Sequence, residues 1–225
     1  MGHAQRCIVQ DFLPTPAALC DQVGLTSGSH ESSFAQCRTA RKHAAADNRA
    51  MKRTLPWVAA LMLAACSPAL NWRSVALDGA ALTATLPCKP DHAVRTVEMA
   101  GLPVELAMAG CEADNATFAI SHAALPDPAR ADTALAHWRA AALARVGAAT
   151  VLSEQAFAPP GTLPLPSAAR LVAQGQRADG AAVTVQGVWF ARAMGPQVRL
   201  YHAVVYTAKP RPDVADAFFA GLTLH

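Results

Sequence analysis

The sequence lacks the residue patterns on which most catalytic and metal sites depend. It contains no Gly-rich phosphate loop, no His-Glu-x-x-His pair and no Gly-x-Ser-x-Gly turn. It also has no Cys-x-x-Cys spacing, which argues against a redox-active dithiol. We therefore expect no catalytic residues, no metal site and no cofactor, and we do not expect an enzyme.

Net charge is also absent from most of the chain. Residues 66–225 contain 12 Lys and Arg against 12 Asp and Glu, whereas residues 1–65 contain 7 basic and 4 acidic residues and account for the formal charge of +3. A neutral domain has no general electrostatic attraction for a phosphate backbone. Nucleic acid is therefore not an expected partner.

The apolar segment 55–66 is too short to span a bilayer, because a spanning helix needs roughly 20 residues. It follows the basic pair Lys52-Arg53 and ends in Leu63-Ala64-Ala65-Cys66. A basic start, a short apolar core and small residues at the end are typical of a secretory signal peptide, here residues 51–65.

The last four residues of this segment resemble the lipobox of bacterial lipoproteins. The resemblance implies that Leu63, Ala64 and Ala65 are recognised by the signal peptidase and that the Cys66 thiol takes the diacylglycerol. Ser67 is compatible with export to the outer membrane, whereas Asp at that position retains such lipoproteins in the inner membrane. We expect a stable membrane anchor of two or three acyl chains in the periplasmic leaflet of the outer membrane.

Residues 1–50 do not fit this arrangement, because they are polar, have no periodic pattern and precede the signal peptide. Met51 lies where an initiator is expected, so residues 1–50 are interpreted as lying upstream of the true start. A disordered cytosolic extension is the alternative. Residues 66–71 then form the lipid anchor and a short tether, and residues 72–225 form a single domain.

Residues 72–225 show strand patterns interrupted by two helical ones. Alternating or continuous apolar residues bounded by turn residues predict strands. Apolar residues at helical spacing predict helices. The expected strands are 72–77, 80–86, 94–99, 104–111, 117–122, 151–157, 169–177, 182–192 and 198–207, and the expected helices are 129–146 and 213–221.

Short turns between the strands favour antiparallel pairing. Asp78-Gly79 predicts a two-residue hairpin, and Gly101-Leu102-Pro103 and residues 112–115 predict further turns. The expected fold is α+β, with a mostly antiparallel sheet of about six to eight strands and one central and one C-terminal helix packed on it.

Several segments resemble PsbP-like envelope proteins. These are the Trp-led first strand, the run Leu86-Pro87-Cys88-Lys89-Pro90, the strand at 199–205 and the closing segment 216–219. The chain departs from that pattern in having Leu86 where Phe is usual, and in its two cysteines. The resemblance implies a PsbP-like fold and a role in binding or assembly.

Cys88 and Cys111 are the two cysteines that remain when Cys66 is acylated. An even pair at strand ends in an oxidising compartment is expected to form a disulfide. A redox-active pair, or a metal site that includes His92, is the alternative.

The histidines do not form a catalytic arrangement in the sequence. Ser121 and His122 are adjacent on a strand, so their side chains point to opposite faces. His202 shares a strand face with Leu200 and Val204 and is interpreted as a hydrogen-bonded core or surface residue. His137 is expected on a solvated helix flank.

Three functions follow from these observations. The leading one is a non-catalytic lipoprotein that binds or assembles an envelope protein partner, and the alternative is a small-ligand carrier with a pocket between sheet and helix. A hydrolase built from distant residues is the third. An apolar cavity of several hundred Å³ favours the carrier, whereas a closed core with an exposed apolar patch favours the partner-binding protein.

Overall fold

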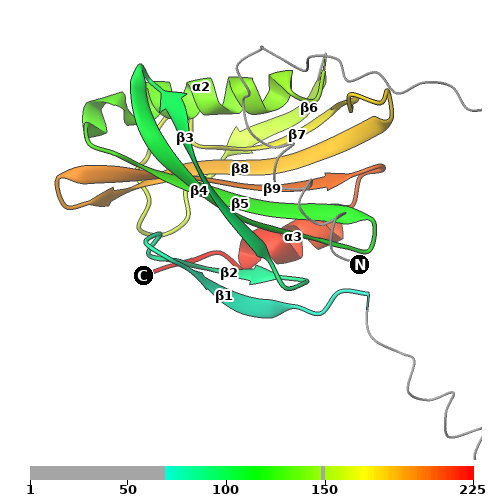
Figure 1. Cartoon of the computed structure of the whole chain (residues 1–225). Helices are drawn as coiled ribbons and strands as arrows, with labels where there is room; N and C mark the ends of the chain where they lie inside the picture. Colours follow the sequence, from blue (N-terminus) through cyan, green and yellow to red (C-terminus); the bar gives the residue numbers. More distant parts are fainter. Residues whose placement is uncertain (1–68, 148–149) are drawn as a thin grey trace, which may run out of the picture. The chain divides into compact units, whose positions relative to one another are not determined.

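The structure is a computed structural model that describes residues 69–147 and 150–225 (Figure 1). The described part is α+β and mostly antiparallel, as predicted. Its elements are β1 (Arg73–Leu77), β2 (Leu82–Leu86), β3 (Asp91–Met99), β4 (Leu102–Ala113), β5 (Ala116–Leu125), the 3-10 helix η2 (Pro128–Arg130), α2 (Ala131–Ala144), β6 (Thr150–Ala156), β7 (Ala169–Gln176), β8 (Ala182–Met194), β9 (Gln197–Thr207), α3 (Pro212–Ala220) and β10 (Thr223–Leu224).

The strands form two sheets, not the single sheet expected. Seven strands make an antiparallel sheet in the order β3-β4-β5-β9-β8-β7-β6, and a separate sheet has the order β1-β2-β10. Strand β10 pairs with β2 through Thr223 and Leu224, at the far end of the sequence. The prediction of one sheet was wrong because the first hairpin, β1–β2, pairs with β10 near the end of the sequence and not with the large sheet.

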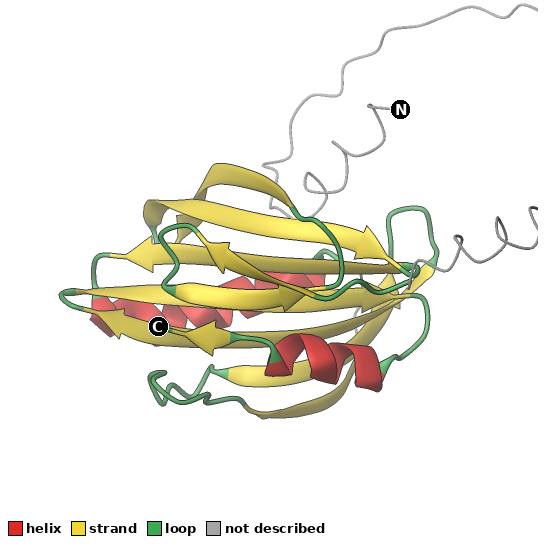
Figure 2. Ribbon diagram, turned by 90° about the horizontal axis from the view of Figure 1, so that it is seen from below, coloured by secondary structure: helices red, strands yellow, loops and turns green. Residues whose placement is uncertain are grey.

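The two helices cover opposite faces of the seven-stranded sheet (Figures 1 and 2). Helix α2 packs on one face, above a core that includes Leu125, Leu135 and Trp189. Helix α3 and the small sheet pack on the other face, around a core that includes Phe118 and Phe218. Strands β5, β8 and β9 are buried on both faces, which explains their nearly continuous apolar sequences.

Local sequence patterns predicted the β4–β5 turn correctly but not the β3–β4 and β1–β2 turns. Asp114 and Asn115 form the β4–β5 turn with φ of 51° and 56°, as expected for a two-residue hairpin. Strands β3 and β4 are joined through Ala100 and Gly101 instead, so the predicted turn lies too far along the chain. The β1–β2 hairpin has a four-residue loop, 78–81, and not the predicted two-residue turn.

The expected helix 129–146 is a 3-10 turn followed by α2. Asp127 accepts a hydrogen bond from the Ala129 backbone N–H at 3.0 Å and so caps the 3-10 turn. No helix in residues 69–147 or 150–225 is long and apolar enough to cross a membrane.

Candidate ligand-binding site

A cavity of about 330 Å³ lies between α2 and the face of the sheet formed by β3, β4, β5 and β9. Most of its wall is apolar. The apolar lining includes Val97, Met99, Leu106, Ala119, Ala142 and Val204, and the polar lining consists of Glu98, Ser121, His137, Arg145, His202 and Tyr206. The cavity is therefore a mostly apolar site with a few polar groups.

Strands β5 and β9 provide the floor of this cavity. Ser121 lies opposite His202 in the β5–β9 register, and Ala119 lies opposite Val204 two residues further along. Tyr206 lies two residues beyond Val204 on β9, at the end of the floor. The floor therefore has polar groups at both ends and an apolar middle.

Helix α2 provides the roof. The Trp138 ring lies edge-on to the His202 ring, with centroids 5.5 Å apart, and Arg145 lies near Tyr206 at the other end of the helix. Between them the helix presents the small residues Ala141 and Ala142. Small side chains in the roof, above Ala119 in the floor, leave the space that forms the cavity.

Three polar contacts hold α2 above the sheet. The Ser167 backbone N–H donates to Asp132 Oδ1 at 2.8 Å. Arg139 Nη1 forms an ion pair with Glu154 Oε1 of β6 at 2.6 Å. Near the start of the helix, Arg130 Nη1 donates to the Ala100 carbonyl of the β3–β4 turn at 2.9 Å. The helix is thus tied to both sides of the sheet beneath it.

His202 is a deeply buried titratable group of the cavity wall. Its ring stacks on Trp189, with centroids 4.3 Å apart and planes at 13°. Burial lowers the pKa of His202 to about 3, so the imidazole is neutral at neutral pH. Its Nε2 atom has no hydrogen-bond partner among the described residues. The predicted hydrogen-bonded histidine is thus a core residue, but its Nε2 atom lacks the expected bond.

The other buried polar groups of the floor are neutral as well. Burial raises the pKa of the Tyr206 hydroxyl, although the nearby charges of Arg145 and Arg177 act in the opposite direction. Ser121 carries an uncharged hydroxyl, and its residue is 7% exposed. The buried part of the floor therefore carries no formal charge at neutral pH.

Ser121 and His122 face opposite sides of the sheet, as the sequence predicted. Ser121 lines the cavity, whereas the Nδ1 atom of His122 lies 2.9 Å from Arg199 Nη1 on the other face. Burial, and then the charge of Arg199, lower the pKa of His122 to about 4. On the same face, the Tyr201 hydroxyl donates to the Ala80 carbonyl at 2.5 Å and links the two sheets.

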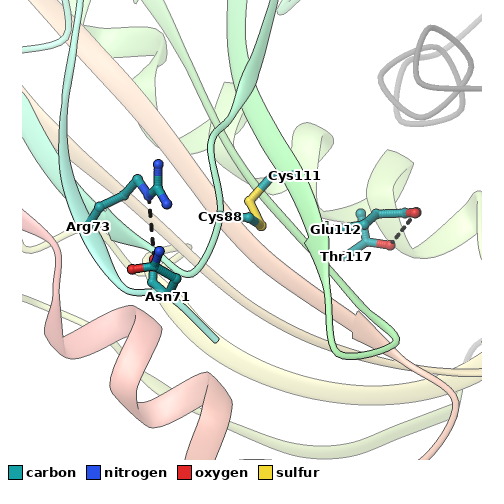
Figure 3. Close-up of a disulfide and its surroundings, with 6 residues drawn as sticks. All are labelled: Asn71, Arg73, Cys88, Cys111, Glu112 and Thr117. Carbon is teal, nitrogen blue, oxygen red and sulfur yellow. Dashed lines mark hydrogen bonds between the residues drawn. A yellow bond between two sulfur atoms is a disulfide. The ribbon is translucent and has the colours of Figure 1, made fainter. Parts of the chain in front are cut away.

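A disulfide joins Cys88 to Cys111, with Cα atoms 5.9 Å apart (Figure 3). It connects the segment after β2 to β4, and so links the small sheet to the large one. His92 is exposed on β3. Within the described ranges, no group of three or more His, Cys, Asp or Glu side chains is arranged to hold a metal ion.

The residues predicted for lipid anchoring and sorting lie outside the described part of the chain. They are Leu63, Ala64, Ala65, Cys66 and Ser67.

Sequence reasoning did not identify the cavity residues as a group. It placed Trp138 and Ala142 on one stripe of the helix and His202 on an apolar strand face. Ala142 and His202 are buried, and Trp138 is partly buried against the core. The sequence feature that could have indicated the cavity is the number of alanines in the helix, because small side chains facing other small side chains leave space. Which strand residues lie beneath them depends on the β5–β9 register, which local patterns do not specify.

No family model and no curated protein matches the sequence. Among solved structures, the chain is similar to the crystal structure of a protein of unknown function from Pseudomonas aeruginosa, with 17% identity and a TM-score of 0.29. The similarity covers 60% of this chain and 83% of that one. At this TM-score the similarity assigns neither fold family nor function.

Proposed function

We propose that this protein is a lipid-anchored, periplasm-facing envelope protein that binds a small, mostly apolar ligand in the cavity beneath α2. The proposal favours the carrier over the partner-binding function. It is a non-catalytic role, in which the domain holds the ligand without changing it.

The cavity is the observation that carries this proposal. Its volume of about 330 Å³ is in the range of small-molecule sites, which begins at roughly 300 Å³. An apolar cavity of about 150 Å³ in another protein binds benzene. The space beneath α2 is therefore sufficient for a ligand of two fused rings or a short acyl chain.

The exposed apolar residues give less support to a partner-binding surface. The large apolar side chains exposed in the described residues are Val94, Val151 and Leu152. Val94 is on β3 and the other two are on β6, which are the opposite edge strands of the seven-stranded sheet. They therefore do not provide the contiguous patch that a docking surface requires.

The envelope location rests on the sequence. Residues 51–65 have the pattern of a signal peptide, Cys66 stands at the acylation position, and Ser67 favours the outer membrane. The resemblance of residues 72–225 to PsbP-like envelope proteins agrees with this location and with a binding role. An antiparallel sheet with a helix on each face is compatible with that resemblance.

Filling the cavity tests the proposal. Ala142 lies in the roof and is 9% exposed, so Ala142→Leu places a larger side chain in the cavity while retaining a good helix former. Ala144 is exposed on the same helix and does not line the cavity, so Ala144→Leu is the matched control. Calorimetric titration with naphthalene and 1-naphthol measures binding to the protein purified from envelopes and held in phospholipid nanodiscs, with empty nanodiscs as the blank.

We expect at least one of the two probes to bind the wild type and Ala144→Leu equally. Ala142→Leu should lose at least tenfold in affinity and keep its melting temperature. Absence of binding of both probes to the folded wild type would contradict the proposal. Equal binding to all three proteins would place the ligand elsewhere.

A further inference from the structure

We infer that the ligand of this cavity is an uncharged molecule with an apolar body and a hydrogen-bonding group, which lies against Ser121 and His202. This inference rests on the proposed function and specifies the chemistry of the ligand. It follows from the positions of the charged, polar and apolar residues in the cavity wall.

The charged residues of the cavity wall do not favour an ion in its interior. Glu98 is exposed on β3 and Arg145 is half-buried at the end of α2, and the two have opposite sign. The buried floor between β5 and β9 contains no Asp, Glu, Lys or Arg among the cavity-lining residues. An ionised group placed there would lose its hydration and find no buried counter-charge.

The interior is nevertheless not purely apolar. Ser121 and His202 are cross-strand neighbours on β5 and β9, and their residues are 7% and 6% exposed. Residues in this position normally satisfy their polar atoms with hydrogen bonds. Because Ser121 and the His202 ring both line the cavity, a hydrogen-bonding group from a ligand would complement this end of it. The enclosed Nε2 atom of His202 lies toward Gly187 of β8 and is not the contact.

The remaining space defines the body of the ligand. Ala119 and Val204 lie two residues from the Ser121 and His202 pair, which is about 7 Å along the strands. Ala141 and Ala142 line the cavity from the helix side. A ligand whose polar group lies beneath Trp138 therefore extends its apolar part over this middle section.

Three probes of the same two-ring frame separate these properties. Naphthalene has no polar group, 1-naphthol adds a neutral hydroxyl, and 1-naphthoate adds a carboxylate that is ionised at pH 7.5. The protein is again the one purified from envelopes and held in nanodiscs. His202→Phe keeps an aromatic ring between Trp138 and Trp189 but removes both nitrogens, and Ser121→Ala removes the hydroxyl.

We expect 1-naphthol to bind the wild type at least tenfold more tightly than either naphthalene or 1-naphthoate. In both His202→Phe and Ser121→Ala the preference for 1-naphthol over naphthalene should fall to about threefold or less. Naphthalene affinity should change less than threefold in either variant. The second variant keeps the test valid if His202→Phe does not fold.

Failure of this inference is distinguishable from failure of the proposed function. Equal binding of naphthalene and 1-naphthol to the wild type, or tightest binding of 1-naphthoate, would overturn the assigned ligand chemistry while leaving the ligand-binding function intact. A 1-naphthol preference that survives in both variants would overturn the assignment to Ser121 and His202. If neither naphthalene nor 1-naphthol binds, the proposed function fails, and this inference fails with it.

Discussion

The ring of His202 lies parallel to the ring of Trp189, with centroids 4.3 Å apart and planes at 13°. The two residues are cross-strand neighbours on β9 and β8, and both rings face α2. Trp138 of α2 meets the same imidazole edge-on. The wall of the cavity is thus continuous with the aromatic core beneath the helix.

Gly187 makes room for this stack. A Cβ atom added at Gly187 would lie 2.6 Å from Trp189 Cη2 and 2.8 Å from Cζ3. Gly187→Ala must therefore displace the indole, and we expect it to lower the free energy of unfolding by about 1–3 kcal/mol, the usual cost of overpacking a core. Urea denaturation followed by tryptophan fluorescence measures the change.

A second substitution tests whether the clash with Trp189 causes the loss of stability in Gly187→Ala. Trp189→Phe removes the ring atoms that the added Cβ would approach. If the clash is responsible, Gly187→Ala should cost distinctly less stability in the Trp189→Phe background than in the wild type. Equal costs in the two backgrounds would show that Gly187 is needed for another reason, such as strand conformation.

Stability should fall in acid because two histidines are buried in their neutral form. Burial lowers the pKa of His202 to about 3 and that of His122 to about 4, both below the ordinary value of 6.5. Between pH 6.5 and these values the unfolded chain binds protons that the native protein does not, so the free energy of unfolding decreases as the pH falls. Between pH 6.5 and 4 we expect His202 alone to account for about 3 kcal/mol of this decrease.

Denaturation curves from pH 4 to pH 8 test this dependence. His202→Phe should reduce the slope below pH 6.5 and leave stability above pH 7 nearly independent of pH. His92 is exposed on β3, so His92→Asn serves as the control and should keep the wild-type slope. An unchanged slope in His202→Phe would mean that native His202 binds a proton over the same pH range as in the unfolded chain.

The Cys88–Cys111 bond should be present in the protein recovered from the envelope. We expect no titratable thiol from either residue under denaturing, non-reducing conditions. The two residues are 23 positions apart, and closing such a loop contributes about 3.5 kcal/mol on the chain-entropy account of disulfides. Cys88→Ser should therefore lower the melting temperature, and the double serine variant should be no less stable than the single one. Two reactive thiols in the isolated protein would contradict the prediction.

Acylation at Cys66 should depend on its thiol. Cys66→Ala should abolish incorporation of a fatty-acid probe and leave the signal peptide uncleaved, because the modified cysteine is what the lipoprotein peptidase recognises. As a matched control, Ser67→Asp should still be labelled but should fractionate with the inner membrane. Equal labelling of Cys66→Ala and the wild type would exclude this residue as the attachment site.

Much of the secondary structure follows from local patterns. Leu82, Ala84 and Leu86 of β2 alternate with Thr83 and Thr85, and all three are buried. The stripe containing Leu135, Ala142 and Val146 likewise lies against the core. Such patterns are readable because a strand or helix must bury one face, and the period of its apolar residues reports that face.

The proposed envelope location rests on the sequence by itself. The proposed signal peptide, acylated cysteine and sorting residue are consecutive within residues 51–67, as a segment that processing enzymes act on in linear form requires. The pairing of β2 with β10, the rings stacked at His202 and the cavity beneath Ala142 were decided only by the tertiary structure. Each depends on which residues of distant strands become neighbours, and that is determined by packing the whole chain, not by the period of any one segment.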